Sequence, residues 1–290
     1  MAFKGLKFLI LLYAVFDLAN AWTYSEQDQW SAEYPTCGSN QQSPIAINSM
    51  EAGAKTHPPI KYDNYKQPFN VIITNNGHSA EIKMPEDAVK PRISGGPLPA
   101  DETYQFENLH FHWGANNSLG SEHVLNNRRY PMEVHAVHYN TKYANLEEAI
   151  QHSDGVTVVT AFYQINSFQR LAALQNVSYA LSAIIEYETT TKIANFKLSG
   201  MYGGIDTTSK RVYYTYAGSL TTPPCSEAVT WIIFPNPVSV TSNQLKPFRK
   251  LRDEHGGILV NNFRQLHNLN GRKIYLNRPG QKEPRIDEDI

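Results

Sequence analysis

Three histidines in the middle of the chain have the residue type and spacing of metal ligands. His110 and His112 are separated by one residue, and His135 follows further along. In an extended strand, side chains at i and i+2 project from the same face, so the first two imidazoles would lie side by side. A reversal of the chain would place His135 on a neighbouring strand. Three neutral imidazoles with an open fourth position suit a catalytic zinc ion.

A chain with ten histidines can contain one His-x-His pair by chance, so the pair alone does not establish a metal site. The residues around it supply the further evidence. Period-two geometry places Asn108 beside His110 and Glu133 beside His135, where each can accept a hydrogen bond from a ring nitrogen. Glu122 lies between the two segments. It is either a solvated loop acid or a group that orients a hydroxyl near the metal.

The segments that must position these side chains are predicted to be strands. Runs rich in β-branched and aromatic residues occur at 71–74, 104–106, 109–113, 132–139, 156–165, 211–216 and 229–234. Helical patterns are few and cover 145–150, 171–186 and a short segment after Thr241. No repeat or linker divides the chain. These patterns predict a mainly β (α+β) single domain with a few short peripheral helices.

The composition is that of an ordinary globular protein with a small-molecule partner. Of the 290 residues, 41% are hydrophobic and 18% are charged, a profile without signs of disorder or a collagen-like repeat. The formal net charge of −1 offers no electrostatic footprint for nucleic acid or an anionic membrane.

The N-terminal segment has the order of a secretory signal peptide. Lysines precede an apolar run from Phe8 to Phe16, and small residues allow cleavage after Ala21. The alternative is a membrane anchor, but the run is short and Asp17 interrupts it. Residues 281–290 are a charged tail without a hydrophobic segment, which argues against a GPI anchor or a second span. We therefore expect a signal peptide at 1–21, a secreted, extracellular protein and a flexible tail.

The two cysteines fit the same compartment. Cys37 and Cys225, once exported, are expected to form a disulfide, the alternative being two buried thiols. The bond would close a loop of nearly the whole mature domain and stabilise the fold by about 4 to 5 kcal/mol in the chain-entropy model. Asn116 and Asn176 each begin an Asn-x-Ser sequon and are candidates for glycosylation.

A set of motifs across the chain resembles the α-class carbonic anhydrases, in particular their secreted animal members. The motifs are HFHWG at 110–114, GSEH at 120–123, EVHAVH at 133–138 and GSLTTPP at 218–224, with QSPI at 42–45, NNGH at 75–78, VTW at 229–231 and NFR at 262–264. The resemblance covers residues 22–280 and implies one twisted, mostly antiparallel sheet of about ten strands. It also implies cis peptide bonds before Pro44 and Pro224.

The resemblance implies a zinc enzyme that interconverts CO2 and bicarbonate. His110, His112 and His135 would bind Zn2+, water would be the fourth ligand, and zinc hydroxide would attack CO2. Thr221 would accept a hydrogen bond from the hydroxide and donate one to Glu122, which aims an oxygen lone pair at the substrate. Sulfonamides and anions would be inhibitors.

An apolar wall and a proton path are implied as well. The wall where CO2 rests would comprise Val137, Val158, Leu220, Val229 and Trp231, beside the hydroxyls of Thr221 and Thr222. His78 matches the proton shuttle of the family, a role that suits an imidazole near neutral pH. Without the resemblance, a histidine in an Asn-Gly turn would be just an exposed turn residue. Tyr24, Asn76 and Thr222 match positions that arrange the intervening waters.

Two residues depart from the family pattern. Asn108 stands where glutamine is common, so its hydrogen bond to His110 is expected to be rebuilt or carried by water. Glu81 stands where a neutral or apolar residue is common, and we expect it to alter proton transfer or inhibitor preference. His123 and His138 match buried, hydrogen-bonded histidines and are predicted to be structural.

Two non-enzymatic functions are alternatives to the carbonic anhydrase activity. A non-catalytic relative that acts as a binding or adhesion module typically lacks a zinc histidine, whereas this chain has all three together with Glu122 and Thr221. A matrix protein that nucleates carbonate mineral usually carries acidic or Gly-rich repeats, which this sequence lacks. Ester hydrolysis is expected as a side activity.

Overall fold

A computed structural model of the chain describes residues 22–205 and 211–278. The predicted signal peptide and C-terminal tail lie outside these residues. Within them, no helix is long and apolar enough to cross a membrane.

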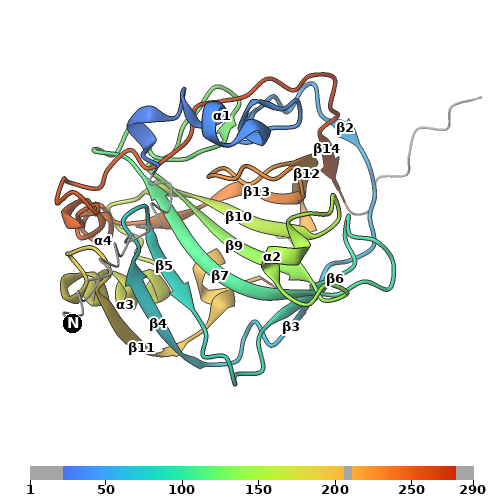
Figure 1. The fold of residues 1–290 in the computed structure, drawn as a ribbon. Coiled ribbons are helices and arrows are strands. Elements are labelled where there is room, and N and C mark those ends of the chain that lie inside the picture. Colours follow the sequence, from blue (N-terminus) through green and yellow to red (C-terminus); the bar gives the residue numbers. More distant parts are fainter. Residues whose placement is uncertain (1–21, 206–210, 279–290) are drawn as a thin grey trace, which may run out of the picture.

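Twelve strands form one twisted, mixed sheet (Figure 1). In spatial order, its main path runs through β11 (Thr190–Phe196), β4 (Phe69–Asn75), β5 (Ala80–Lys83), β7 (Tyr104–Trp113), β9 (Met132–Asn140), β10 (Val156–Ile165), β13 (Val229–Val240), β12 (Tyr213–Gly218), β14 (Tyr275–Asn277) and β2 (Gly53–Ala54). At one side, β6 (Arg92–Ser94) joins β7 to β3 (Lys61–Asp63). The predicted mainly β, single-domain fold is confirmed, with twelve strands in place of about ten.

Most neighbours in the sheet are antiparallel. The exceptions are the pairs β10–β13 and β14–β2. A separate parallel pair joins β1 (Ala46–Ile47) to β8 (Val124–Leu125). The long central pairs β7–β9 and β9–β10 are antiparallel, so the candidate metal ligands lie on the most extensively paired part of the sheet.

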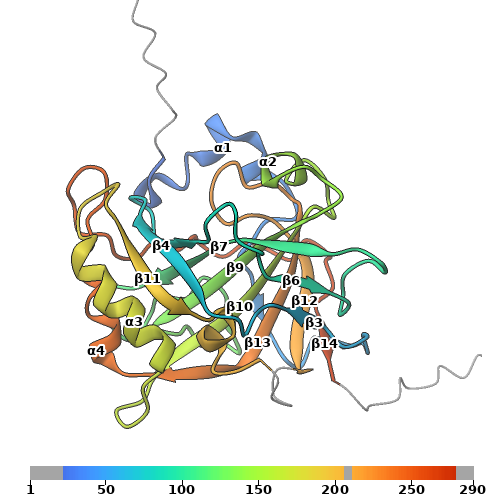
Figure 2. The same cartoon turned by 90° about the horizontal axis from the view of Figure 1, so that it is seen from below.

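The helices are short and peripheral, as the sequence predicts. They are α1 (Trp30–Glu33), α2 (Leu146–Ala149), α3 (Ala172–Ala180) and α4 (Ser242–Leu245), with 3-10 turns at Tyr24–Glu26, Pro35–Gly38, Leu181–Ala183, Leu198–Tyr202 and Phe248–Lys250. Figure 2 shows α3 between β11 and α4. Leu174 and Val177 on α3 are buried in the main core, and a capping box of Thr241 and Gln244 begins α4.

The two faces of the sheet pack into different clusters. On β9, Val134 and Ala136 belong to the larger core, whereas Val137 belongs to a second cluster on the opposite face. His135 shares the face of Val137 because side chains alternate along a strand. The alternation therefore holds the histidines on the face away from the larger core.

The disulfide and the two cis prolines are present. The Sγ atoms of Cys37 and Cys225 lie 2.05 Å apart, so the predicted disulfide is confirmed. The peptide bonds before Pro44 and Pro224 are cis, as the resemblance implies. The disulfide ties the segment after α1 to the loop that carries Thr221.

Candidate metal centre

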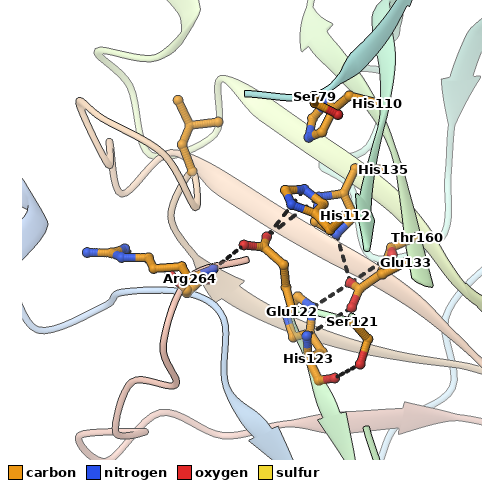
Figure 3. A network of polar contacts seen from close by, with 12 residues as sticks. Ser79, His110, His112, Ser121, Glu122, His123, Glu133, His135, Thr160 and Arg264 are labelled. Atoms are coloured by element: carbon orange, nitrogen blue, oxygen red, sulfur yellow. Dashed lines mark hydrogen bonds and ion pairs between the residues drawn. The ribbon is translucent and has the colours of Figure 1, made fainter. Parts of the chain in front are cut away.

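The three candidate ligands meet on neighbouring strands. His110 on β7 is the direct cross-strand partner of His135 on β9, and His112 is opposite Glu133. The ring centroid of His112 lies 4.5 Å from that of His135 and 5.1 Å from that of His110. Figure 3 shows the three rings side by side. The strand pairing thus brings together the residues that period-two geometry puts on one face.

Each ring donates one hydrogen bond that fixes its orientation. Nδ1 of His110 donates to Oδ1 of Asn108 at 2.9 Å. Nδ1 of His112 donates to the backbone carbonyl of Asn262 at 2.7 Å, and Nε2 of His135 donates to Oε1 of Glu133 at 2.7 Å. A neutral imidazole has one N–H. The other nitrogens, Nε2 of His110 and His112 and Nδ1 of His135, are therefore lone-pair donors for a metal.

The distances between these nitrogens fit a bound cation. Nε2 of His112 and Nδ1 of His135 lie 3.1 Å apart, although the partners of both rings leave each nitrogen with a lone pair. Two facing lone pairs repel unless a cation lies between them. Zn–N bonds of 2.0–2.1 Å in a tetrahedron put the nitrogens about 3.3 Å apart. The ligand atoms of all three histidines lie within 4.8 Å of one another, so these residues fit a three-histidine zinc site.

Burial keeps two of the rings in the form that binds metal. The pKa of His110 is well below its usual value, first because of burial and then because of the neighbouring His112 and His135. Burial also lowers the pKa of His112, although the charge of Glu122 partly opposes it. Both imidazoles are therefore neutral at pH 7, as metal ligation requires.

Asn108 makes its hydrogen bond directly, despite its short side chain. The register between β7 and β9 shifts between Phe106 and Asn108, which is the irregularity of a β-bulge. A bulge bends its strand and re-aims the side chains beside it. The bulge therefore adjoins Asn108, whose side chain is one methylene shorter than the glutamine that is common in the family. Asn108 contacts His110 directly, without a bridging water.

Glu133 is the centre of a buried network. Its Oε1 accepts from Nε2 of His135, from Nδ1 of His123 at 2.8 Å and from Oγ1 of Thr160 at 3.0 Å. Burial alone would raise the pKa of Glu133, but the charge and hydrogen bonds of His123, with the hydrogen bond of His135, hold it well below its usual range. The carboxylate is thus ionised and fully engaged. His123, Glu133 and His135 already satisfy one another and form a hydrogen-bonded group rather than a second metal site.

Glu122 is fully buried and points one oxygen at the histidines. Its Oε1 accepts from the backbone N–H of Arg264 at 2.8 Å. Its Oε2 lies 3.5 Å from Nε2 of His112 and 3.9 Å from Nδ1 of His135. Among the described residues this oxygen has no hydrogen-bond partner, so the bond from Thr221 that the resemblance implies is not formed here. The oxygen faces the space where a ligand on the metal would be held.

The predicted apolar wall lies next to His135. Val158 is the cross-strand partner of both Val137 and Trp231, and the ring of Trp231 lies 5.0 Å from that of His135. Val229 belongs to the same buried cluster, and Leu220 packs against it. Thr221 is buried and Thr222 is half-buried. Five apolar side chains from β9, β10, β13 and the loop before Thr221 therefore cluster beside the third histidine.

His78 lies in the turn between β4 and β5, where Oδ1 of Asn76 accepts from the backbone N–H of His78 and of Ser79. The His78 ring stacks on Trp22, with centroids 3.8 Å apart. Burial lowers the pKa of His78, and the nearby acids Glu254 and Asp253 partly oppose this shift. The imidazole is half-buried, and its lowered pKa favours release of a proton.

Two further predicted residues lie near His78 and His110. Tyr24 is half-buried, and burial, followed by the charge of Glu122, raises its pKa well above the usual value. Its hydroxyl therefore keeps its proton at neutral pH. Glu81 is the cross-strand partner of His110 and forms an ion pair with Lys83 at 3.1 Å. A charged pair thus adjoins the first histidine, where the family commonly has a neutral residue.

Several residues of the site carry no clear sequence pattern. Asn262 contacts His112, and Arg264 contacts Glu122, through backbone groups that any residue possesses. Tyr216 reaches Nε2 of His123 from β12 at 2.8 Å. His138 binds the hydroxyl of Tyr65 at 2.6 Å, on the other face of β9. His123 and His138 are both buried and hydrogen-bonded outside the candidate ligand set.

The sequence was compared with protein families and with known proteins. Residues 25–278 match the family model of the eukaryotic-type carbonic anhydrases. The chain belongs to this carbonic anhydrase family. It is 38% identical over 260 residues to putative carbonic anhydrase 3 of Caenorhabditis elegans, which covers 87% of this chain and 96% of that protein. Carbonic anhydrase 7 of Mus musculus and of Homo sapiens are each 33% identical over 264 residues, 88% of this chain and 96% of those proteins. As a member of the carbonic anhydrase family, the chain is an enzyme of the lyase class.

Proposed function

We propose that this protein is a zinc enzyme that catalyses the reversible hydration of CO2 to bicarbonate and a proton. The observation that carries the proposal is the cluster of His110, His112 and His135, in which Nε2 of His112 and Nδ1 of His135 lie 3.1 Å apart, in a chain of the carbonic anhydrase family. A cation held by the three rings would stabilise this close approach. Neutral nitrogen ligands with an open fourth position favour zinc over the hard, oxygen-bound cations.

The chain supplies the ligands and their orientation. His110, His112 and His135 would hold the ion, and their partners fix which nitrogen of each ring faces it. Bound there, the ion supplies Lewis acidity, which makes a water molecule nucleophilic near neutral pH. Because Glu133 is ionised and buried, it strengthens His135 as a ligand.

Glu122 and Thr221 would position the nucleophile. The unpartnered Oε2 of Glu122 faces the space beside His112 and His135, where it can accept a hydrogen bond from a hydroxyl. Thr221 lies buried near the start of the loop that follows β12, and its hydroxyl would link the nucleophile to Glu122. Fixing one lone pair toward the substrate lowers the entropic part of the barrier.

The apolar wall would receive CO2, which has no net charge and no hydrogen-bond donor. Val137, Val158 and Trp231 lie beside His135 and provide a surface that does not compete for a metal position. Bicarbonate is an anion and is less stable on such a surface than in water. The same wall therefore favours binding of the gas and release of the product.

His78 would carry the proton away from the site. Its half-buried ring lies near Tyr24, whose hydroxyl stays protonated, and an imidazole suits transfer near neutral pH. Asn76 holds the backbone of this turn, and Thr222 lies half-buried in the loop after Thr221. These groups would order the waters between the metal and His78.

The decisive experiment is a CO2 hydration assay of the purified protein loaded with zinc. We expect acceleration that disappears on removal of zinc by a chelator, returns on its addition and is blocked by an aromatic sulfonamide. His135→Ala, with one ligand missing, is the matched negative control. Absence of acceleration by the zinc-loaded parent would rule out the enzyme function proposed here.

We also propose that the protein is secreted and glycosylated. The buried Cys37–Cys225 disulfide supports an oxidising compartment, and the side chains of Asn116 and Asn176 are exposed. Expression of the full chain in a secretory cell line should place it in the medium with Trp22 as its first residue, and endoglycosidase should increase its gel mobility. Retention inside the cell with an intact N-terminus would contradict secretion.

A further inference from the structure

A cavity of about 160 Å3 lies beside His78, where it is large enough for several waters. Its lining comes from three parts of the chain: Thr23 to Ser25, the turn of Gly77 and His78, and the loop from Asp253 to His255 with the apolar residues Ile258 to Val260 that follow it. The first two contain residues already assigned to proton transfer. The third, which we call the acidic loop and define as residues 253–257, has no role in the function proposed above.

The acidic loop is held at a fixed position against the turn of His78. Gly77 has φ +81°, and a Cβ at this position would lie 2.9 Å from the ring of Tyr187 and 3.5 Å from the backbone nitrogen of Glu254. The side-chain amide of Asn75 donates to the backbone carbonyl of Arg252 at 2.9 Å. Within the loop, the backbone N–H of Asp253 donates to the carbonyl of Gly257 at 2.9 Å. The loop and the shuttle turn therefore form one packed unit.

The acidic loop presents a second imidazole to solvent. The side chain of His255 is 70% exposed, and its Nε2 lies 3.5 Å from Oε1 of Glu254. That oxygen is shielded from solvent and has no hydrogen-bond partner in the part of the chain that the structure describes. A carboxylate in this position stabilises positive charge on a neighbouring ring. His78, by contrast, is half-buried under Trp22.

We propose that His255 is a second proton carrier, which takes the proton from His78 through the waters of this cavity and delivers it to buffer. This inference rests on the function proposed above. Protonated His78 loses its proton to a water chain, neutral His255 gains one, and a buffer base then removes it, so that both rings return to the neutral form. Glu254 remains a carboxylate throughout and positions the charge on His255. Transfer between two imidazoles requires little driving force, and exposure of the second one gives buffer free access.

The first test measures turnover of zinc-loaded protein at low and at high buffer concentration. His255→Gln should lower kcat by about threefold in dilute buffer and leave it unchanged in concentrated buffer, where small bases reach His78 directly. kcat/KM for CO2 should not change, because this ratio depends only on the steps before proton release. His152→Gln is the matched control, since His152 is an exposed histidine that stacks on Tyr143 on another part of the surface. In a His78→Ala background, His255→Gln should have no further effect.

The second test does not require activity. NMR titration of the His78 ring should show a lower midpoint in Glu254→Gln than in the parent, because the charge that favours protonated His78 is lost. An unchanged midpoint would remove Glu254 from the proton path, and equal turnover of His255→Gln and the parent in dilute buffer would overturn the inference.

The two proposals fail in different ways. Isotope exchange between CO2 and bicarbonate at equilibrium does not require proton export. If the parent lacks this exchange, the proposed function fails and the second carrier fails with it. If the parent shows exchange but His255→Gln behaves like the parent in dilute buffer, only the second carrier is excluded.

Discussion

The backbone carbonyl of Asn262 accepts a hydrogen bond of 2.7 Å from Nδ1 of His112, a residue 150 positions earlier in the chain. The side chain of the same asparagine accepts from the backbone N–H of Trp113 and donates to the carbonyls of Phe111 and His78. One buried residue therefore orients a candidate zinc ligand and holds the turn of the candidate shuttle.

Asn262→Ala should lower the free energy of unfolding by about 2 to 4 kcal/mol, because it removes the side-chain partner of the Trp113 N–H and of the His78 carbonyl and one of the two donors to the Phe111 carbonyl. Urea unfolding of the parent and the variant measures this change. Asn117→Ala is the control, since Asn117 is exposed and bonds only to surface groups. Equal losses in the two variants would contradict the role of Asn262.

His135→Ala should reduce zinc affinity by more than about 100-fold. It removes one of three ligands, and even loss of an outer partner of a ligand costs about 10- to 100-fold. Competition with a chromophoric chelator measures the affinity, and His152→Gln should bind zinc like the parent. Full zinc occupancy of the variant in this competition would exclude the three-histidine site.

Asn108→Ala should weaken zinc binding by about tenfold, because the ring of His110 loses the acceptor that fixes its tautomer. Asn108→Gln keeps an amide oxygen and should lose less zinc affinity than Asn108→Ala. The same chelator competition distinguishes the three proteins. If the Ala variant bound zinc as tightly as the parent, the direct 2.9 Å contact with His110 would have no role in metal binding.

Glu122→Gln should lower kcat by about 100-fold while zinc stays bound. The amide oxygen can still accept from the backbone N–H of Arg264, but the variant lacks the negative charge that faces the histidines. The hydration assay gives kcat, and metal analysis of the same sample gives occupancy. A fall in zinc content that accounts for the lost activity would contradict a positioning role for this carboxylate.

The protein should lose stability as the pH falls below 6.5. Burial lowers the pKa of His138 to about 3. Between this value and the ordinary pKa of about 6.5, the unfolded chain binds a proton that the native chain excludes. The free energy of unfolding then decreases by about 1.4 kcal/mol per pH unit, or about 2 kcal/mol at pH 5. His138→Gln, which cannot titrate, should show a difference between pH 7 and pH 5 that is smaller by this amount in urea unfolding. If the free energy of unfolding fell equally in the parent and the variant between pH 7 and pH 5, groups other than His138 would cause the acid sensitivity.

The sequence predicts most of the long strands, with β11 as the exception, but not the short ones. The runs at 104–106 and 109–113 form one strand, β7, because the bulge near Asn108 interrupts the pattern without ending the pairing. β2, β3, β6 and β14 contain only two or three residues each. Such strands are too short to show an alternation of apolar and polar side chains, so their places follow only from the folded sheet.

The local part of the site follows from spacing, whereas the distant part does not. Asn108 with His110, and Glu133 with His135, obey the i and i+2 rule of a strand, and both pairs are hydrogen-bonded. The acceptor for His112 is a backbone carbonyl, which has no residue-type signature. The register of β7 against β9 also depends on the whole sheet. Side-chain spacing therefore predicts the ligands, and the tertiary fold supplies their remaining partners.

The long-range contact between His112 and Asn262 has a consequence for how the protein is made. A ribosome completes residues 108–135, with all three candidate ligands, well before residue 262. Until then His112 lacks its acceptor, Glu122 lacks the N–H of Arg264, and Cys37 awaits Cys225. Zinc captured by the growing chain would meet rings that are free to rotate. The arrangement of the candidate ligands thus belongs to the nearly complete chain, so we expect metal loading to follow synthesis and folding.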